Sequence, residues 1–363
     1  MSKQTEYHIL GLMSGSSLDG IDMAYCKIQI NNPYTFTIIA AATFPFSNEE
    51  FMMLKNCSPD IHYNYQQEDA LFAKVSANAV NNFLQNNNLP KPDAIASHGH
   101  TVFHFPALGK TKQIGNGQLI ANLTGCKVIY DFRSADVEAG GQGAPLVPLC
   151  DAIFFNNYHA CLNIGGIANI SFDTPTGRIG FDICGANQLL NYIAQTIDLP
   201  FDENGELAAA GFVDEQLLSE LNACTYFQLP YPKSLDNHFV RKYFIERIAA
   251  ANISVNDKLA TATYHIAQQI TNVIQQQNTL HQNYQLLITG GGAFNIYLIQ
   301  LIEKLAGIKI ILPTNEIIQF KEALAMCLMG VEKLQNKPNF LPSVTGARFA
   351  VSGGVVVVPE KQD

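Results

Sequence analysis

The chain has 363 residues, of which 47% are hydrophobic and 15% charged, with a formal net charge of −9 at pH 7. This length predicts about two domains with ordinary cores. The few Lys and Arg residues argue against a nucleic-acid surface or an anionic-membrane surface. The chain contains neither an apolar run typical of a signal peptide nor the ~18 uncharged apolar residues of a membrane span. We therefore expect a cytoplasmic protein.

The first half of the chain opens with a strand, a glycine-serine turn and a second strand at residues 8–28. A further strand at 35–43 and a helix at about 66–85 follow. The helix carries an apolar stripe at i, i+4 spacing, formed by Leu71, Val75, Ala79 and Phe83. Short buried strands are expected at 93–97 and 127–132. The glycine-rich segment AGGQGAP at 139–145 is the expected hinge.

The second half repeats the opening at residues 159–173, with Gly165 lying 150 residues after Gly15. The later elements are expected as a strand at 178–181, helices at 185–197 and 254–276, a strand at 286–289 and a helix at 294–304. The helix at 254–276 has one apolar face and begins with a capping-box pattern; the face is formed by Leu259, Thr263, Ile266, Ile270 and Val273. Strands interleaved with helices indicate α/β layers with mostly parallel sheets, which the two hairpins make mixed.

The tips of the two hairpins lack large side chains, so their backbone N–H groups can approach an anion closely. Two such tips facing each other would hold a polyphosphate from both sides, which predicts an ATP-dependent phosphotransferase built by duplication. Residues 15–20 match the glycines of a P-loop, but Ile21 and Asp22 stand where Lys and Ser/Thr are required, so a P-loop is excluded. The alternative is a solvent-exposed turn closed by Asp19-Gly20.

If the first tip binds phosphate, serine hydroxyls and backbone amides make the contacts, and Asp19 and Asp22 hold Mg²⁺ directly or through water. The nucleotide-binding residues expected there are Gly15, Ser16, Ser17, Leu18, Asp19, Gly20, Ile21 and Asp22, with Ser14 beside them. The triple glycine at 290–292 lies between a strand and a helix. It could hold adenosine or its α-phosphate near a helix N-terminus, or it could simply form a tight turn.

Asp182 ends the expected strand RIGFD and precedes a helix, which places it at the sheet edge where α/β sites form. The helix N-terminus should keep its carboxylate ionised, as a general base requires. The alternative is an N-cap that serves only the helix.

His98 and His100 lie two residues apart on a strand, so they would face the same side and could chelate zinc. A buried, hydrogen-bonded histidine is the simpler interpretation of His104. Arg133 could pair bidentately with a substrate carboxylate, or it could form a structural ion pair with a nearby acid.

The order of the two hairpins and the strand-GGG-helix unit resembles the actin/Hsp70/sugar-kinase superfamily. The residue sequences of the individual motifs resemble those of the anhydro-N-acetylmuramic acid kinase family. The matching stretches are GLMSGSSLDGID at 11–22, SHGHTVFH at 97–104, DFRSADVEAGGQGAPLVP at 131–148, LNIGGIANIS at 162–171, GFDICGAN at 180–187, PKS at 232–234, TGGGAFN at 289–295 and VTGA at 344–347.

This resemblance implies an α/β fold of two duplicated actin-like (ribonuclease-H-like) domains, with mixed five-stranded sheets flanked by helices and an active-site cleft between them. We expect an N-terminal domain of residues 1–140 plus about 341–363, and a C-terminal domain of residues 141–340. The family uses ATP and Mg²⁺ to convert 1,6-anhydro-N-acetylmuramic acid, a product of peptidoglycan turnover, to the 6-phosphate, while water opens the anhydro bridge.

The resemblance also implies roles for single residues. Asp182 would activate the water and contact the sugar, and Glu322 would assist. The sugar would be bound by Ser14, His98, His100 and Arg133, and the nucleotide also by Gly165, Gly166, Gly290, Gly291, Gly292 and Asn295. The implied partners are an amino sugar and ATP, without nucleic acid or membrane, and a homodimer is compatible with this set.

Three departures from the family pattern keep alternatives open. The family usually has Gln at the position of His100, and the residues after Asp182 (ICGA) and after PKS (LDNH) also differ. A kinase of the same fold acting on another sugar is therefore the first alternative. A metal-dependent hydrolase using His98 and His100 is a second, and a nucleotide-dependent scaffold of the actin/Hsp70 type is a third.

Overall fold

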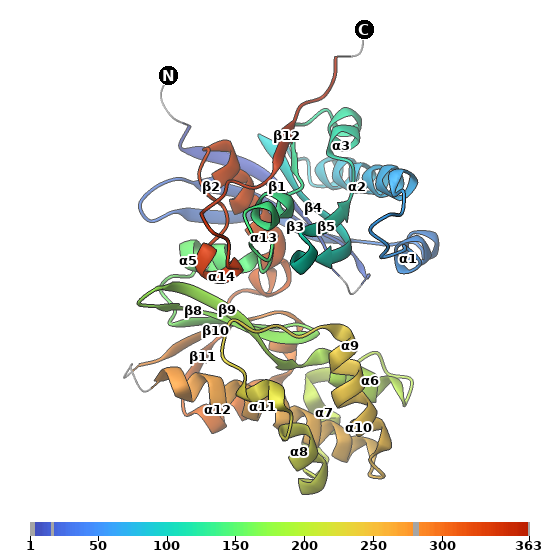
Figure 1. Cartoon of the computed structure of the whole chain (residues 1–363), viewed down its shortest axis with the longest axis vertical. Helices are drawn as coiled ribbons and strands as arrows, with labels where there is room; N and C mark the ends of the chain where they lie inside the picture. Colours follow the sequence, from blue (N-terminus) through green and yellow to red (C-terminus); the bar gives the residue numbers. More distant parts are fainter. Residues whose placement is uncertain (1–3, 16–17, 279–282, 362–363) are drawn as a thin grey trace. The chain divides into compact units, whose positions relative to one another are not determined.

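The computed structural model describes residues 4–15, 18–278 and 283–361. The chain forms two compact units (Figure 1). The first unit comprises Met1–Phe154 and Phe320–Asp363, and the second comprises Phe155–Gln319. Every helix in the described ranges is too short or too polar to cross a membrane.

The first unit is built on a mixed sheet with the order β12-β6-β4-β1-β2-β3, in which β5 also pairs with β4. Strands β1, β2 and β3 form an antiparallel meander, whereas β4 runs parallel to β1 and β6 runs parallel to β4. The strands are β1 (Glu6–Ser14), β2 (Gly20–Gln29), β3 (Thr35–Pro45), β4 (Ala94–Phe105), β5 (Lys110–Ile114), β6 (Val128–Tyr130) and β12 (Val355–Val357).

The second unit repeats this plan with the strand order β11-β10-β7-β8-β9. Its first three strands again form an antiparallel meander, and β10 and β11 again add in parallel. The strands are β7 (Ala160–Ile164), β8 (Ile167–Thr174), β9 (Gly177–Gly185), β10 (Gln285–Thr289) and β11 (Lys309–Ile311). Because β9-β8-β7-β10-β11 matches β3-β2-β1-β4-β6, the predicted duplication is confirmed; within the described residues, the first sheet also contains β5 and β12.

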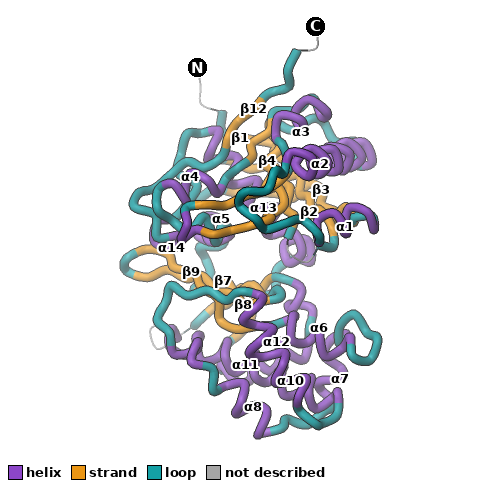
Figure 2. The backbone as a smooth tube through the Cα atoms, turned by 45° about the vertical axis from the view of Figure 1, so that its right-hand side comes forward, coloured by secondary structure: helices purple, strands orange, loops and turns teal. Residues whose placement is uncertain are grey.

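The helices of the first unit flank its sheet (Figure 2). They are α1 (Asn48–Lys55), α2 (Gln66–Asn86), α3 (Gly117–Thr124), α4 (Arg133–Glu138), α5 (Val147–Phe154), α14 (Pro342–Thr345) and most of α13 (Asn315–Leu334). The predicted stripe on α2 is wrong at its start, because Leu71 is 49% exposed whereas Phe72 is buried. In the first turns of α2, the buried face therefore contains Phe72 in place of the predicted Leu71.

The units divide at Phe154/Phe155 and Gln319/Phe320, not at the glycine-rich segment or near residue 340. Helices α5 and α13 are tied together by the buried ion pair of Lys321 Nζ and Asp151 Oδ1, 3.1 Å apart. Helix α13 is also bound to the sheet, since Cys327 Sγ donates to the carbonyls of Ile9 and Ala24.

The expected hinge at 139–145 lies inside the first unit. The fully buried Asp136 accepts hydrogen bonds from Gly143 N (2.7 Å) and Thr345 Oγ1 (2.8 Å), and Gln142 N donates to the carbonyl of Thr345. These bonds fix the segment against α14, so the glycines serve close packing rather than a boundary between the units.

The helices of the second unit include α11 and α12, which both lie on the same side of its sheet (Figures 1 and 2). They are α6 (Asn187–Gln195), α7 (Glu206–Ala209), α8 (Glu215–Asn222), α9 (Asn237–Val240), α10 (Glu246–Ala250), α11 (Val255–Asn278) and α12 (Ile296–Ala306). The predicted face of α11 is confirmed: Leu259, Ile266 and Ile270 are fully buried, and the N-terminal Ser254 Oγ accepts from Asp257 N.

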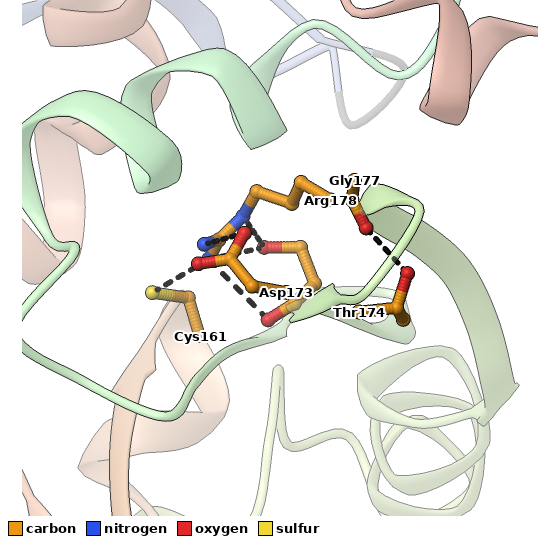
Figure 3. Close-up of polar contacts among 6 residues, drawn as sticks. Cys161, Asp173, Thr174, Gly177 and Arg178 are labelled. Atoms are coloured by element: carbon orange, nitrogen blue, oxygen red, sulfur yellow. Dashed lines mark hydrogen bonds and ion pairs between the residues drawn. The ribbon is translucent and has the colours of Figure 1, made fainter.

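The β8–β9 pair is fixed at its turn by a buried arginine (Figure 3). Arg178 donates to Ser171 Oγ and pairs with Asp173 Oδ1 at 3.3 Å, directly across the two strands. Thr174 Oγ1 donates to the carbonyl of Gly177 at 2.6 Å and closes the turn. Since a one-residue slip would break all of these contacts, they hold the register of β9.

Candidate active site

In the second unit, Asp182 lies in a row of residues that crosses the sheet. It pairs with Asn169 of β8, Asn169 pairs with Asn163 of β7, and Asn163 pairs with Thr289 of β10. Thr289 is the last residue of its strand and Gly290 follows it. The pairing therefore brings Asp182 to the same level of the sheet as the triple glycine, although they are more than 100 residues apart in the chain.

Asp182 does not end its strand as predicted, because β9 continues to Gly185. The register shifts here: Asn169 pairs with Asp182 and Ala168 with Cys184, so Ile183 is an extra residue in β9. Such bulges re-aim side chains and are frequent beside active sites. The N-cap alternative is also wrong, since the residue before α6 is Ala186 and has no side-chain cap.

The segment 226–235 forms three hydrogen bonds with Asp182. Leu235 N donates to Asp182 Oδ2 at 2.9 Å, Tyr226 Oη donates to the Asp182 carbonyl at 2.6 Å, and Asp182 N donates to the Lys233 carbonyl at 3.2 Å. Backbone and carboxylate are thus both fixed. One carboxylate oxygen, Oδ2, is engaged by an amide.

Burial raises the pKa of Asp182, and the hydrogen bond from Leu235 only partly offsets this. Burial thus shifts the pKa opposite to the lowering expected from a helix N-terminus. A carboxylate whose pKa is raised accepts a proton more readily, which suits a general base.

The second hairpin tip is bound to the start of α6. Ala186 N and Gln188 N donate to the Gly166 carbonyl, and Asn187 N donates to the Gly165 carbonyl. A Cβ on Gly166 would lie 3.0 Å from Gln188 Cγ. Gly166 therefore permits close packing on a helix N-terminus, and the carbonyls of both tip glycines are already used.

The three glycines at 290–292 differ in how much space a Cβ atom would have. Gly290 has a φ of 82°, and a Cβ there would lie 2.6 Å from Asn163 Oδ1; a Cβ on Gly292 would collide with Ile164. The nearest atom to a Cβ on Gly291 is Asn187 Nδ2 at 3.5 Å. Gly290 and Gly292 are thus required by packing on β7, whereas packing does not require a glycine at 291.

Asn295 is the N-cap of α12, where its Oδ1 accepts from Leu298 N at 3.0 Å. The helix begins at Ile296, two residues later than predicted, because Gly291–Phe294 form a 3₁₀ turn. The structure thus gives Asn295 a structural role, and contact with a nucleotide stays a prediction.

In the first unit, a second bulge shapes the site on β1 and β4. Leu12 pairs with Ser97 and Ser14 pairs with His100, so β4 contains one extra residue. Gly99 lies in this bulge with a φ of 73°, and a Cβ there would lie 2.5 Å from the Ile114 carbonyl oxygen. Ser14 Oγ and His100 Nδ1 are hydrogen-bonded at 3.0 Å.

Both ring nitrogens of His98 are hydrogen-bonded to protein groups. Arg133 Nε donates to His98 Nε2 at 2.9 Å, which requires a lone pair on Nε2, and the proton on Nδ1 can then donate to the Gly99 carbonyl at 2.9 Å. Burial and the charge of Arg133 hold the pKa of His98 well below its usual value, and burial lowers the pKa of His100 to about 4. Both rings are therefore neutral at pH 7.

The zinc interpretation is not supported. His98 and His100 have separate partners, and the described ranges contain no group of three or more His, Cys, Asp or Glu that could hold a metal ion. His104 has the simpler role expected for it, since its Nδ1 is hydrogen-bonded to Thr111 Oγ1 at 2.9 Å.

Arg133 is not part of a structural ion pair within the described part of the chain. Besides His98, its Nη1 donates to the Gly143 carbonyl at 2.7 Å. Burial lowers the pKa of Arg133 to about 10, and the charge of Glu322 opposes this shift. The guanidinium stays charged at pH 7 and retains N–H groups for an anion.

Burial and neighbouring carboxylates raise the pKa of both Asp22 and Glu322 in the first unit. Burial raises the pKa of Asp22, partly offset by the hydrogen bond from Thr43 Oγ1 (2.6 Å), and Asp19 raises it further. Burial and the charge of Asp22 raise the pKa of Glu322, whereas Lys321 and Arg133 lower it. Carboxylate oxygens suit Mg²⁺, which commonly takes one or two protein carboxylates and completes its shell with phosphates and water.

The first hairpin tip differs from a P-loop, as predicted, because β2 and not a helix follows it at Gly20. Leu18 has a φ of 58°, and its N–H points to the Gly15 carbonyl at 3.5 Å. Ser16 and Ser17 lie outside the described residues.

The sequence comparisons agree with this arrangement. A family model described as anhydro-N-acetylmuramic acid kinase matches residues 7–359. The chain belongs to this family. It is 36% identical to a protein of this name from Haemophilus influenzae, over 96% of this chain and 97% of that protein. It is 35% identical to another from Shewanella denitrificans, over 98% and 99% of the two chains.

Among solved structures, the activator of the 2-hydroxyisocaproyl-CoA dehydratase from Clostridium difficile with bound ADPNP has a TM-score of 0.46 and 14% identity, covering 91% of this chain and 96% of that chain. The family membership rests on the sequence matches and not on this likeness.

The sequence missed four residues of the site: Tyr226, Leu235, Asn163 and Asn169. The two asparagines stand in LNIGGIANIS, where polar side chains interrupt two buried strands, and this interruption could have identified them. Tyr226 and Leu235 act through a hydroxyl and a backbone amide, for which the sequence carries no signal.

Proposed function

We propose that the protein is an ATP-dependent kinase that phosphorylates 1,6-anhydro-N-acetylmuramic acid and opens its anhydro ring with water. The products are N-acetylmuramic acid 6-phosphate and ADP. The observation that carries this proposal is the position of Asp182, anchored by segment 226–235 and level with the triple glycine, in a chain of this family.

Asp182 acts as the general base. It takes a proton from a water molecule whose oxygen forms a bond to C1 of the sugar. The C1–O6 bond of the anhydro bridge breaks, and its electron pair stays on O6. O6 then bonds to the γ-phosphorus of ATP, and the bond from that phosphorus to the β-γ bridging oxygen breaks to release ADP. The raised pKa of Asp182 favours the proton transfer.

The first unit supplies recognition of the sugar. Arg133 pairs with the lactyl carboxylate, for which a charged guanidinium that forms no direct ion pair among the described residues is suited. His98 positions Arg133. Ser14 and the neutral His100 form a polar pair for sugar hydroxyl groups.

The nucleotide contacts Gly291, where packing does not require a glycine, together with the backbone amides of both hairpin tips. Asp22 and Glu322 would hold Mg²⁺, which neutralises phosphate charge when bound; Asp19 lies near enough to influence Asp22. Because ATP is a cytoplasmic substrate, we place the reaction in the cytoplasm. A homodimer stays a prediction that light scattering would test.

The test is to incubate the purified protein with Mg-ATP and the anhydro sugar in H₂¹⁸O, following ADP by a coupled assay and the sugar phosphate by mass spectrometry. We expect ADP and sugar phosphate in equal amounts, with ¹⁸O at C1. N-acetylglucosamine, which lacks both the lactyl group and the anhydro bridge, is the control. ADP release no faster than without sugar would overturn the proposal, and preference for another sugar would favour the same-fold alternative.

A further inference from the structure

The second unit contains a cavity of about 490 Å³ beside its edge strand. Phe181 and Ile183 of β9 line one wall, segment 227–233 lines another, and the C-terminal half of α11 closes the third. Asp182, which lies between the two β9 residues, is not among the lining residues. The cavity is therefore separate from the carboxylate of the proposed base, although it shares the same strand.

The walls combine aromatic faces with amides and one ammonium group. Phe181 and Tyr231 are stacked, with centroids 5.4 Å apart and planes 8° apart, and Tyr231 is 49% exposed. Lys233 Nζ lies 5.9 Å from the centroid of Phe181. The amide side chains all come from α11 and are Gln269, Asn272, Gln275 and Gln276. Gln269 Nε2 already donates to Asn222 Oδ1 and Gln275 Nε2 to the Leu305 carbonyl, so Asn272 is the amide considered for ligand binding.

The ammonium of Lys233 has no carboxylate partner within the described residues. It donates to the carbonyls of Tyr226 (3.2 Å) and Phe227 (3.4 Å) and lies over the ring of Tyr226. Burial lowers the pKa of Lys233. A half-buried cation without an anion, at the wall of a cavity, is the arrangement that an anionic ligand would complete.

We propose that this cavity binds an anionic sugar. The C–H face of the sugar ring packs on the aromatic wall, the Asn272 amide of α11 bonds to a hydroxyl group, and a carboxylate or phosphate pairs with Lys233. The volume is that of a small-molecule site, where few polar groups fix orientation on apolar walls. This binding does not depend on the proposed kinase activity.

An occupant would act on Asp182 through the segment that binds both. The Lys233 carbonyl accepts from Asp182 N, and Leu235 N, two residues on, donates to the Asp182 carboxylate. A ligand that pairs with Lys233 therefore contacts the segment that holds the base. We expect it to change kcat more than KM for the sugar substrate.

The test is isothermal titration of the full-length protein with N-acetylglucosamine 6-phosphate, glucuronate and neutral N-acetylglucosamine, with saturating ATP analogue and the anhydro sugar present to fill the active site. We expect saturable binding of at least one anion, about tenfold tighter than the neutral sugar. The two anions separate a phosphate preference from a carboxylate preference.

Asn272→Trp would fill the cavity from α11 and should weaken binding at least about tenfold. Ser219→Trp places the same side chain on the exposed face of α8 and should leave binding and basal activity unchanged. Lys233→Met should also abolish binding of the anion. If Lys233→Met does not fold, the result for Asn272→Trp decides the question. The absence of saturable binding, equal binding of the neutral sugar, or unchanged binding in Asn272→Trp would each overturn the proposal, and none of these outcomes bears on turnover of the anhydro sugar.

Discussion

The two units share one sheet plan but carry opposite chemistry at their bulges. In the first unit, the bulge at Gly99 of β4 accompanies neutral histidines and a charged arginine. In the second, the bulge at Ile183 of β9 accompanies a single carboxylate, Asp182. The duplicated sheets supply the scaffold, and one bulge in each of them lies beside candidate site residues.

The two hairpin tips differ in the same way. The tip at Gly165–Gly166 gives its carbonyls to the first amides of α6, so it is packed on a helix. In the first tip, Gly20 instead packs on β3, since a Cβ there would collide with the Phe44 carbonyl oxygen. The two tips therefore pack against different kinds of element, although their sequences are alike.

The largest expected effect on catalysis follows from removing the proposed base, Asp182, of the second unit. Asp182→Asn should lower kcat at least about 10²–10⁴-fold, the typical contribution of a general base, because an amide cannot take the proton from water. Titration with an ATP analogue should show unchanged nucleotide affinity. Asn keeps the shape and can still accept from Leu235 N, so retained turnover would remove Asp182 from the mechanism.

The matching change in the first unit concerns charge recognition. Arg133→Met should raise KM for the anhydro sugar about 10–100-fold, since a charged hydrogen bond contributes about 1.5–3 kcal/mol. A substrate analogue with an amide in place of the lactyl carboxylate supplies the second arm of a double cycle. The ratio of KM for the amide analogue to KM for the anhydro sugar is then compared between the variant and the wild type. If this ratio is the same in both, Arg133 does not bind the lactyl carboxylate.

The sequence predicted the strands, the hairpins and the triple glycine because these depend on local patterns: alternating apolar residues, turn glycines and short buried runs. It predicted Asp182 and Arg133 as candidates but not their surroundings. The bond from Leu235 to Asp182 spans 53 residues and that from Arg133 to His98 spans 35. Such contacts depend on how the chain folds back, and no local pattern specifies them.

The wrong expectation for Asp182 has the same origin. A strand end before a helix suggested a carboxylate stabilised by the helix N-terminus. Ile183 instead lengthens β9 through a bulge, so that segment 226–235 and burial set the pKa of the carboxyl group. The segment's own sequence, with PKS followed by Leu235, indicates nothing of this role.

A smaller effect is expected from the support of the base. Tyr226→Phe removes the hydroxyl that donates to the Asp182 carbonyl at 2.6 Å and keeps the ring under Lys233. We expect kcat to fall about three- to tenfold, in line with about 0.5–1.5 kcal/mol for one hydrogen bond, with little change in KM. The acid limb of the pH–rate profile should also shift, because the position of Asp182 changes. Tyr63→Phe, in the first unit, is the matched control and should change neither quantity.

The smallest effect is on stability and concerns the first unit. The native pKa of Glu322 is raised by burial and by Asp22, so the folded state binds its proton more tightly than the unfolded state does. Its contribution to stability is therefore fully present below the unfolded pKa of about 4.3 and is lost as pH rises through the native pKa. Glu322→Gln removes this loss.

The melting temperature of Glu322→Gln should accordingly exceed that of the wild type at pH 7.5, and the gain should shrink at pH 4, where the wild-type carboxyl is largely protonated. The exposed Glu138 of the same unit provides the control, since Glu138→Gln should change stability by no more than about 0.5 kcal/mol at either pH. Activity should fall in Glu322→Gln if the carboxylate serves the reaction. A stability gain of equal size at both pH values would show that burial of the charge is not the cause. A loss of stability at pH 7.5 would show that the attraction of the Glu322 carboxylate to Lys321 and Arg133 outweighs the free-energy cost of burying its charge.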